Sequence, residues 1–396
     1  MTGPLAALRV LDFSSLLPGP YATMFLADLG ADVIRVEGPQ RPDPMRSMQP
    51  RDGDSSTWHG VLGRSKRALA LDLKNPAAAA VVKRLVQTHD IVLDQFRPGV
   101  MDRLGIGYGA LQEANPRVIY CALTGYGQTG PYRDRAGHDI NYLALAGVAS
   151  VLGRKEHGPT PLGVQVADVG AGSLLALVGI LAAEIHRRET GVGQFVDVSM
   201  YDGSLAWNLL PAMTALVTGV DPGRETMRLN GGGYYDFYRT ADGRYMSVGS
   251  LEPKFLRALC EAVGRPDLVE PGLSGEAAGR QRVKQALRDI FAGRTQEEWM
   301  DVFATVDACV EPVLGVSEAL QHEQARARDM LVDVPRADGA LQRQIANPLK
   351  FSRSRPEYRF TGAPVGAHTD AILAEAGYSE AEIQSLRDAG LFGEAP

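Results

Sequence analysis

Two ionisable residues each stand at the start of an apolar segment with helical spacing. His138 follows Gly137, and Asp168 lies in an apolar setting between Ala167 and Val169. The start of a helix has free N–H groups and the positive end of the helix dipole, so it favours anions and developing negative charge. A histidine and an aspartate at two such starts could form an acid/base pair around a carbon acid. Desolvation by its neighbours would raise the pKa of Asp168 toward the range of a useful base.

The same residues have a simpler interpretation. Asp168 and Asp139 would be ordinary N-caps, and His138 would be a surface loop residue. The two helix starts taken alone favour this interpretation, so the choice depends on the rest of the chain.

Composition limits the possible classes of protein. The chain has 396 residues, which is enough for two domains and a sizeable core, and its composition of 45% hydrophobic and 22% charged residues is that of an ordinary globular protein. A net charge of -6 gives no global attraction for nucleic acid, so an anionic ligand would need a local basic cluster. Three unpatterned cysteines predict a reduced compartment without a disulfide framework.

The sequence pattern predicts neither a signal segment nor a membrane span. The chain starts directly with a strand-like segment, and its longest apolar run, Leu174 to Ala183, is short for a membrane span and contains Gly179. We therefore expect a cytoplasmic protein that has neither a membrane nor a nucleic-acid partner.

The first part of the chain alternates strands and helices. Strands are expected at 8–13, 33–36, 68–73, 91–95 and 118–123, with helices at 20–29 and 76–88 and a further strand at 195–198. Apolar runs separated by helices predict an α/β fold with a parallel, doubly wound sheet. The turn after the first strand, S-S-L-L-P-G-P, contains no G-x-G-x-x-G, which argues against a nicotinamide or flavin dinucleotide.

The pattern changes after an apolar helix predicted at 201–217. Aromatic strand candidates at 234–238 and 245–248 flank Asp242-Gly243, a hairpin signal, and helices follow at 252–262, 277–291 and 296–304. Thr295 and Glu298 form a capping-box pattern before the last of these. We predict a small α+β domain at 231–321 and a linker at 219–230. Residues 1–218 and 322–396 would form the large domain, with a hairpin at Asp338-Gly339 and two final helices.

A set of cations in the N-terminal half could bind an anion. It comprises Arg35, Arg64, Lys66, Arg67, Lys74, Arg97 and Arg103. Open α/β sheets bind ligands outside the carboxyl ends of their strands, and Arg35, Lys74 and Arg97 stand at or just past predicted strand ends. Guanidinium and ammonium groups there suit phosphates. The alternative is a set of scattered, solvated charges, and the pattern leaves both possibilities open.

Two features of the predicted small domain also have two interpretations. Glu252 lies in the first turn of a helix, where the helix dipole favours a carboxylate, or it orients and charges a histidine. The segment N-G-G-G-Y-Y at Asn230–Tyr235 is a domain hinge, or a backbone that comes close to a ligand.

As an ordered series of motifs, the chain resembles the class III CoA-transferase family, also called CaiB/BaiF, and in particular its α-methylacyl-CoA racemases. The motifs cover nearly the whole chain and include D-L-G-A-D-V-I-R-V-E, F-R-P-G-V-M-D-R-L-G, G-H-D-I-N-Y, A-D-V-G-A-G-S and L-E-P-K-F. The resemblance implies a large Rossmann-like domain from both chain ends and a small domain from the middle. It also implies an interlocked homodimer, with the active site between the large domain of one subunit and the small domain of the other.

The resemblance implies roles for single residues as well. His138 and Asp168 match the two catalytic positions, and Glu252 matches a carboxylate that the partner subunit supplies to the histidine. CoA would be bound on the large domain as part of an acyl-CoA substrate, with no separate cofactor and no metal. The residues implied in binding the CoA thioester are Arg35, Leu71, Lys74, Phe96, Arg97, Val100, Arg103, Asp139 and Tyr142.

The chemistry of a thioester agrees with these roles. Removal of the α-proton puts charge on the thioester oxygen, and one N–H donor to that oxygen is worth roughly 3 kcal/mol. Inversion of the α-carbon needs a base on each face, and His138 and Asp168 supply one each. We therefore predict a racemase of 2-methyl-branched acyl-CoA thioesters that works through an enolate.

Two alternatives remain open. In a CoA-transferase, Asp168 would be a nucleophile that forms an acyl anhydride and then a thioester with CoA. His138 favours proton transfer, whereas Asn230-Gly-Gly-Gly departs from the racemase pattern and is similar to the glycine loop of the transferases. The second alternative is a CoA-thioester binding protein without turnover, against which the intact set of His138, Asp168 and Glu252 counts.

Overall fold

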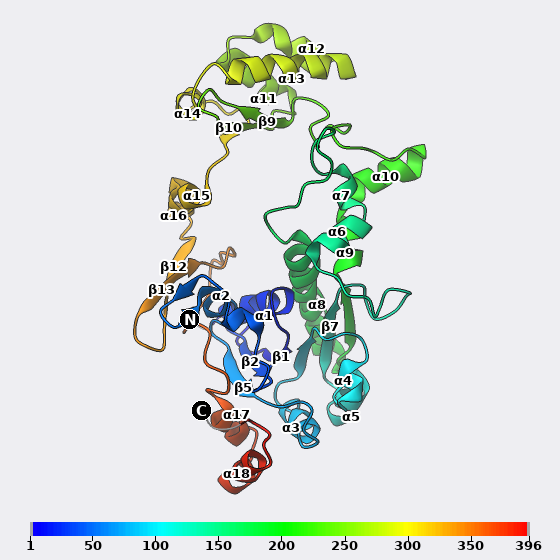
Figure 1. The fold of residues 1–396 in the computed structure, drawn as a ribbon, viewed down its shortest axis with the longest axis vertical. Helices are drawn as coiled ribbons and strands as arrows, with labels where there is room; N and C mark the ends of the chain where they lie inside the picture. Colours follow the sequence, from blue (N-terminus) through cyan, green and yellow to red (C-terminus); the bar gives the residue numbers. More distant parts are fainter. Residues whose placement is uncertain (1–2, 394–396) are drawn as a thin grey trace. The chain divides into compact units, whose positions relative to one another are not determined.

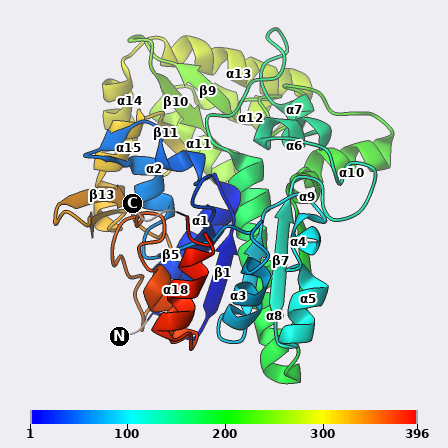
Figure 2. The ribbon, with the colours of Figure 1, turned by 60° about the horizontal axis from the view of Figure 1, so that its bottom comes forward.

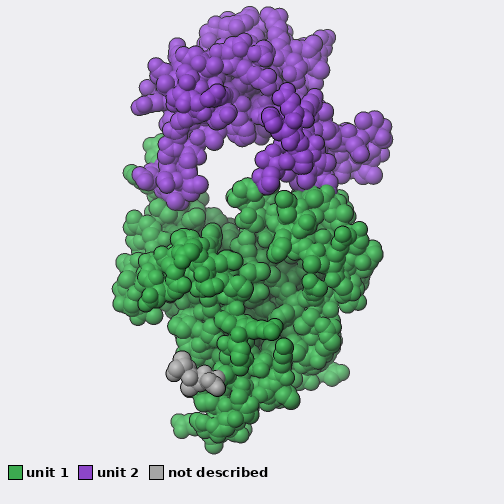
Figure 3. Space-filling model, in the orientation of Figure 1, with its two compact units in different colours: residues 1–146, 162–207, 323–396 green, residues 147–161, 208–322 purple. Residues whose placement is uncertain are grey.

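The computed structural model describes residues 3–393, and the chain divides into two compact units (Figure 3). Unit 1 consists of Met1–Ala146, Leu162–Trp207 and Glu323–Pro396, and unit 2 of Gly147–Pro161 and Asn208–His322. Unit 2 therefore takes up the segment 147–161, and it begins at 208 where we expected the large domain to continue to 218.

Unit 1 is built around a six-stranded sheet with the strand order β5–β2–β1–β6–β7–β8 (Figures 1 and 2). All neighbouring strands are parallel, which confirms the predicted α/β class. Among the six strands taken in chain order, this is the Rossmann order, which reverses between β1 and β6. The strands are β1 (Arg9–Phe13), β2 (Asp32–Glu37), β5 (Arg67–Ala70), β6 (Ile91–Asp94), β7 (Ile119–Thr124) and β8 (Phe195–Ser199).

The central strands are buried on both faces because their sequences are almost continuously apolar. One face is covered by α3, α17 and α18, whose apolar residues share a core with β1 and β2 (Figures 1 and 2). The other face receives α1, which starts at Pro18, and α8, which contacts β7 and β8. The helices named here are α1 (Pro18–Asp28), α3 (Ala78–Leu85), α8 (Leu175–Thr190), α17 (Thr369–Glu375) and α18 (Glu380–Asp388).

Shorter elements complete unit 1. The hairpin predicted around Asp338-Gly339 is present as β12 and β13, which pair antiparallel. The remaining elements are η1 (Pro44–Arg46), β3 (Arg51–Asp52), β4 (Ser55–Ser56), α2 (Thr57–Leu62), α4 (Val100–Arg103), α5 (Tyr108–Ala114), α6 (Asp139–Leu145), η2 (Val166–Leu174), α9 (Met200–Trp207), α16 (Glu323–Ala327), β12 (Leu331–Pro335) and β13 (Leu341–Ile345).

The helix that carries Asp168 differs from the expected one. Its first part, η2, is a π-helix that continues directly into α8, and Gly191 at φ 79° ends it. The joined helix Val166–Thr190 has 25 residues, and an 18-residue window within it has a mean hydropathy of 2.0, so by length and composition alone it could cross a membrane. Our expectation that no segment is long enough was wrong here, because the helix extends beyond the run Leu174 to Ala183 on both sides. Its contacts with β7 and β8 make it a core helix of the sheet.

Unit 2 contains an antiparallel sheet in the order β11–β10–β9. The predicted hairpin is formed by β9 and β10, and Gly243 takes the left-handed conformation in its turn (φ 82°). The capping box of Thr295 and Glu298 is present. The elements are α7 (Val148–Val151), α10 (Leu209–Thr218), β9 (Asp236–Arg239), β10 (Tyr245–Val248), α11 (Pro253–Ala262), η3 (Pro266–Leu268), α12 (Val269–Leu273), α13 (Ala277–Phe291), α14 (Gln296–Phe303), β11 (Val310–Pro312) and α15 (Val316–Gln321).

The apolar helix predicted at 201–217 is two helices, α9 and α10. The break falls at Asn208, where the chain passes from unit 1 to unit 2. The apolar pattern alone does not reveal this break because it continues through both helices.

Candidate active site

The candidate residues of unit 1 gather at the carboxyl edge of the sheet. In a parallel sheet the segments that follow the strands all emerge at this edge, and ligands bind where the strand order reverses. α1 follows β1, the turn Phe96–Gly99 follows β6, and α6 and η2 follow β7. The side chain of Gln95 accepts a hydrogen bond from the N–H of Gly19 (2.9 Å), which joins the end of β6 to the start of α1 across the reversal point.

His138 is the N-cap residue of α6, but its imidazole does not form the cap. The side chain of Asn141 closes the helix start by accepting a hydrogen bond from the N–H of His138 (3.0 Å). The histidine side chain is exposed, and its ring forms no hydrogen bond with residues 3–393. The imidazole is therefore held at the helix start by its backbone, and its ring is accessible to a ligand.

Asp139 connects the two helix starts. Its Oδ1 accepts hydrogen bonds from the backbone N–H groups of Ala167 (2.6 Å) and Asp168 (3.1 Å). Asp139 thus caps η2 rather than its own helix, and it fixes the backbone of Asp168 beside the residue that follows His138. The interpretation of Asp139 as a helix cap therefore holds, although the helix that it caps is η2.

Asp168 is not a cap. Its backbone N–H and carbonyl are hydrogen-bonded, but its carboxylate accepts no hydrogen bond from any residue that the structure describes. Burial of the half-buried side chain and the neighbouring charge of Asp139 raise the pKa of Asp168 to about 6, against the opposing effect of His138. A carboxyl group with this pKa can accept or donate a proton near neutral pH.

The π-helical turn around Asp168 is lined by small residues, which lets neighbouring elements approach. Ser173 Oγ donates to the carbonyl of Pro18 (2.6 Å), so η2 is tied to the start of α1. A Cβ on Gly203 of α9 would lie 2.7 Å from the Cβ of Ala171, so α9 packs closely only with glycine there. π-helical turns are rare and occur frequently at functional sites.

Tyr142 shapes the loop before His138. It is 4% exposed, and its hydroxyl donates to the carbonyl of Gly137 (2.6 Å). A Cβ on Gly125 or Gly137 would lie 2.7 Å from the tyrosine ring, so glycine is needed on both sides of it. The contact with the CoA chain that we expected of Tyr142 is limited by this burial.

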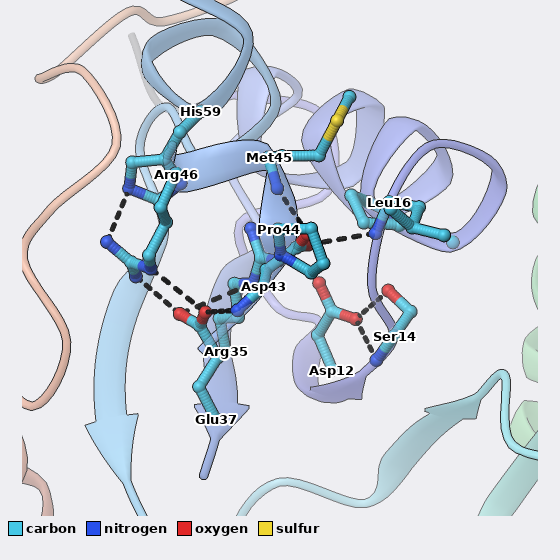
Figure 4. A network of polar contacts seen from close by, with 12 residues as sticks. Asp12, Ser14, Leu16, Arg35, Glu37, Asp43, Pro44, Met45, Arg46 and His59 are labelled. Carbon is cyan, nitrogen blue, oxygen red and sulfur yellow. Dashed lines mark hydrogen bonds and ion pairs between the residues drawn. The ribbon is translucent and has the colours of Figure 1, made fainter. Parts of the chain in front are cut away.

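Four of the seven candidate cations are paired inside unit 1. Arg64 binds both carboxylate oxygens of Asp28 (2.8 and 2.6 Å), Lys66 lies 3.2 Å from Asp12, and Arg67 binds Asp32 and Glu375. Figure 4 shows Arg35 beside the carboxylates of Asp43 and Glu37, to which it is ion-paired.

These contacts correct two of the expected CoA contacts. Arg35 is 2% exposed, so a phosphate would have to displace two carboxylates to reach its guanidinium. Leu71 is fully buried in the core beside α3 and α17, so its side chain has no surface for a nucleotide. Strand-end positions in the sequence do not distinguish inward-facing from outward-facing side chains.

The other three cations remain available. Lys74, Arg97 and Arg103 are exposed and form no ion pair within residues 3–393. Phe96, which is 37% exposed, precedes Arg97, and the partly exposed Val100 begins α4. The side chains of these five residues are therefore accessible to a ligand.

Arg133 is a further cation that the sequence analysis did not single out. A Cβ on Gly99 would lie 3.4 Å from Nη1 of Arg103 and 3.9 Å from Nη2 of Arg133, so two guanidinium groups meet at this turn. Among the described residues, Arg133 has one ion-pair partner, its neighbour Asp134 (3.6 Å, both exposed). The segment P-Y-R-D-R at 131–135, three residues before His138, is the signal that could have identified it.

Glu252 belongs to unit 2, whereas His138 and Asp168 belong to unit 1. Glu252 is exposed and is the N-cap residue of α11, and its charge acts on the thiol of Cys309. The structure therefore brings together His138, Asp139 and Asp168 within unit 1, and it places Glu252 on the other unit.

Unit 1 is thus an α/β fold in which an exposed histidine, a carboxyl group with a raised pKa and cations without an ion pair among the described residues lie at the carboxyl edge of a parallel sheet. The chain belongs to CoA-transferase family III, whose family model matches residues 5–369. This confirms the resemblance inferred from the motifs.

Relatives of two kinds are similar to the chain. It is 38% identical to the alpha-methylacyl-CoA racemase of Homo sapiens, over 96% of both chains. It is 31% identical to the succinate–glutarate CoA-transferase of Agrobacterium fabrum, over 94% of this chain and 95% of that protein. A crystal structure of a CaiB/BaiF family protein from Brucella suis matches 95% of this chain and 100% of that one with a TM-score of 0.82 and 28% identity.

Proposed function

We propose that the protein racemises 2-methyl-branched acyl-CoA thioesters by proton transfer at the α-carbon, with His138 and Asp168 as the two bases. The observation that carries this proposal is the pair of hydrogen bonds from the N–H groups of Ala167 and Asp168 to the carboxylate of Asp139. It holds a free imidazole and a free carboxyl group with a raised pKa at two adjoining helix starts. The similarity to alpha-methylacyl-CoA racemases supports the same reaction.

The reaction needs two proton transfers and one site for negative charge. One base removes the α-proton, and the electron pair of the C–H bond moves into the thioester carbonyl to give an enolate. The N–H groups of Asp139 and Ile140 at the start of α6 have no acceptor within residues 3–393, and they are suited to receive the enolate oxygen. The acid on the opposite face then returns a proton to the α-carbon and inverts it.

The CoA part of the substrate would be bound at the same edge of the sheet. Lys74, Arg97 and Arg103, with Arg133, are the cations available for its phosphates. Phe96 and Val100 offer apolar surface next to them.

We further propose that the active protein is an interlocked homodimer in which Glu252 of the partner subunit pairs with His138. Large apolar side chains on two helices of the single chain are exposed, among them Val178 and Ile185 on α8 and Leu216 and Val217 on α10. Exposed apolar patches of this kind are typical of protein interfaces.

A hydrogen-isotope exchange experiment tests the reaction. A single enantiomer of a 2-methylacyl-CoA, incubated with the protein in heavy water, should take up deuterium at the α-carbon and lose optical purity. The His138→Ala variant should no longer racemise the thioester while still binding CoA. Absence of exchange, with CoA appearing on an added carboxylic acid, would contradict the proposal.

CoA transfer is the second candidate, and two observations favour it. The carboxylate of Asp168 accepts no hydrogen bond from the part of the chain that the structure describes, which suits a nucleophile, and relatives at 30–33% identity are CoA-transferases by name. Asp168 would attack the thioester carbonyl and expel the CoA thiolate, forming an acyl anhydride. Hydroxylamine added during turnover would attack the activated carbonyl carbon of Asp168 and release the acyl group as its carboxylate, and mass spectrometry would detect the resulting hydroxamate on the peptide that contains Asp168.

A further inference from the structure

Two of the cations proposed for the CoA phosphates follow strand ends that share a sequence pattern. The pattern begins just after β5, as L-D-L-K-N-P at 71–76, and again at the end of β6, as L-D-Q-F-R-P at 93–98. Both segments read L-D-x-x-x-P, and each has one cation, Lys74 or Arg97, between its aspartate and its proline. The proposed proton transfer uses neither aspartate.

Each aspartate binds the backbone two residues ahead of it. Oδ1 of Asp72 accepts a hydrogen bond from the N–H of Lys74 (3.1 Å), and Oδ1 of Asp94 accepts one from the N–H of Phe96 (2.8 Å). Aspartate commonly closes turns in this way, with its side chain in the place of a backbone carbonyl. Neither carboxylate forms an ion pair within residues 3–393, so Lys74 and Arg97 keep their charges.

The carboxylate of Asp94 is held from two sides. It is 6% exposed, and the hydroxyl of Tyr120 on β7 donates to its Oδ2 (3.0 Å). The Tyr120 ring is stacked on that of Phe195 at a centroid distance of 5.6 Å, which fixes the position of the hydroxyl. Burial raises the pKa of Asp94 to about 6, so at neutral pH the group is mainly a carboxylate that accepts both hydrogen bonds.

The rest of the turn after β6 has little conformational freedom. Pro98 fixes its own φ angle and disfavours helical backbone at Arg97, and Gly99 takes the left-handed conformation (φ 77°). The hydrogen bond from Phe96 to Asp94 restrains the backbone between the strand and this proline. Together these features hold the backbone of Arg97 in one conformation.

The turn after β5 has the same construction. Pro76 disfavours helical backbone at Asn75, whose N–H donates to the carbonyl of Asp72 (3.0 Å). The N–H of Asp72 donates to the carbonyl of Leu391 (2.8 Å), which ties the turn to the C-terminal segment. The backbone of Lys74 is therefore restrained on both sides.

A third strand end has the same hydrogen bond without an available cation. Asp12 of β1 accepts from the N–H of Ser14 (3.0 Å), but its carboxylate is also bonded to Thr23 and Lys66. Leu16 stands where the other two segments have proline. The hydrogen bond alone is thus a common way to end a strand, and the turns after β5 and β6 combine it with a proline and a free cation.

We propose that Asp72 and Asp94 are positioning residues for CoA binding, an inference that rests on the proposed function above. Each holds the backbone of one turn, so that Lys74 or Arg97 meets a phosphate without first losing the freedom of its backbone. The two aspartates act through the turns and do not contact CoA. They serve as hydrogen-bond acceptors, and their charge is not required.

Calorimetric titration with CoA tests the two roles. Asp72→Ala and Asp94→Ala should each weaken binding by about 5-fold, the size of one net hydrogen bond. Asp72→Asn and Asp94→Asn should stay within about 2-fold of the wild type, because an amide oxygen accepts the same hydrogen bond. Asn115→Ala is the matched control and should leave the affinity unchanged. Asn115 accepts a hydrogen bond from the N–H of Arg117 (3.0 Å), but it stands before β7, at the amino edge of the sheet.

A double-mutant cycle separates positioning from general damage to the fold. In an Arg97→Ala background, Asp94→Ala should cost less than about 2-fold in CoA affinity, because no cation remains for that turn to hold. Asp72→Ala in the same background should still cost about 5-fold, since Lys74 is intact. Additive losses for Asp94→Ala and Arg97→Ala, or a loss in Asp94→Asn as large as in Asp94→Ala, would overturn the role of Asp94.

Two further variants keep the test independent of folding. If Asp94→Ala does not fold because the hydroxyl of Tyr120 loses its acceptor, Asp94→Ala combined with Tyr120→Phe removes that hydroxyl. Asp72 is only half-buried, so Asp72→Ala tests the same inference at the other turn.

Failure of the reaction is seen separately from failure of this inference. CoA binding that weakens as expected in the two alanine variants, without racemisation by the wild type, would support the positioning roles and contradict the proposed function. CoA binding that both alanine variants leave unchanged would overturn the positioning roles alone. Absence of CoA binding by the wild type would overturn both.

Discussion

Two aspartates at the same edge of the same sheet have opposite electrostatic surroundings. Asp12, in β1, is fully buried, and burial opposes its ionisation. Lys66 and Arg35, with hydrogen bonds from Ser14 and Thr23, outweigh that effect and hold the pKa of Asp12 below its usual range. Asp168 is also desolvated, but its nearest carboxylate, Asp139, adds to the effect of burial and raises its pKa to about 6.

The difference separates a structural carboxylate from a reactive one. Asp12 accepts hydrogen bonds from Ser14, Thr23 and Lys66, so it is a permanent anion within the network of Figure 4. Asp168 accepts none from the described residues and titrates near neutral pH. Burial alone does not make a functional carboxylate, and the partners that surround it decide its role.

The largest expected effect is on catalysis by Asp168. Asp168→Asn keeps the shape of the side chain and removes the proton acceptor, so racemisation should fall by at least about 10³-fold, within the usual size of an acid/base contribution. Circular dichroism and kinetics on the same preparation check this. Retention of more than a tenth of the activity would contradict the role of Asp168.

Asp168→Asn should not destabilise the protein. The pKa of Asp168 is raised in the folded state, so ionisation of this residue destabilises the fold. This destabilisation is absent below about pH 4, where the group is protonated in both states, and it is complete above about pH 6. At pH 7 the variant should be as stable as the wild type or more stable by about 1 kcal/mol, after allowance for partial exposure of the side chain. Urea unfolding at pH 4 and pH 7 measures the difference, which should vanish at the lower pH.

Asp12→Asn should give the opposite result. It leaves Lys66 buried without its carboxylate, and the loss of one partner of a buried pair costs about 3–5 kcal/mol. Replacing both residues, in Asp12→Asn with Lys66→Met, should restore much of that stability because no unpaired charge remains buried. A double variant as unstable as Asp12→Asn would show that the pair itself is not the cause.

A smaller effect is expected for the unpaired cations. Arg97→Ala should raise KM for acyl-CoA by about 10-fold, since a charge-assisted bond contributes about 1.5–3 kcal/mol, with little change in kcat. Arg9→Ala is the control, because Arg9 is also exposed but stands at the amino end of β1, at the opposite edge of the sheet. Equal effects of the two substitutions would rule out a specific phosphate contact for Arg97.

The smallest effect concerns pH. For the enantiomer from which Asp168 removes the proton, the carboxylate form is needed, so kcat/KM should fall as pH drops below about 6. For the other enantiomer Asp168 donates the proton, and kcat/KM should fall as pH rises above that value. Asp139→Asn retains an acceptor for the N–H groups of Ala167 and Asp168 but removes the charge, so both limits should shift to lower pH by less than about one unit.

The parallel sheet could be predicted from the sequence, but the burial and the ion pairs of several side chains around it could not. Apolar runs such as Ile91–Asp94 predict buried parallel strands because a strand covered on both faces has no polar alternation. Arg35 and Lys66 could not be recognised as internal, because their carboxylate partners Asp43 and Asp12 lie elsewhere in the sequence. Pairing of this kind depends on tertiary structure.

The candidate site shows the same limit. The sequence identified His138 and Asp168 at two helix starts, and the family resemblance gave them roles. It did not show that Asp139 caps the helix of Asp168 across 28 residues, nor that this helix starts with a π-helical turn. Both features depend on contacts between residues that are far apart in the sequence. Because Asp139 caps this helix, the carboxyl group of Asp168 does not have to serve as its cap.

The most direct test follows deuterium uptake from each enantiomer in the two single-base variants. The two-base account predicts that Asp168→Asn and His138→Gln both fail to racemise. Each should still exchange the α-proton of one enantiomer, and the two variants should retain exchange with opposite enantiomers. Loss of exchange with both enantiomers in one variant and normal racemisation in the other would contradict the account.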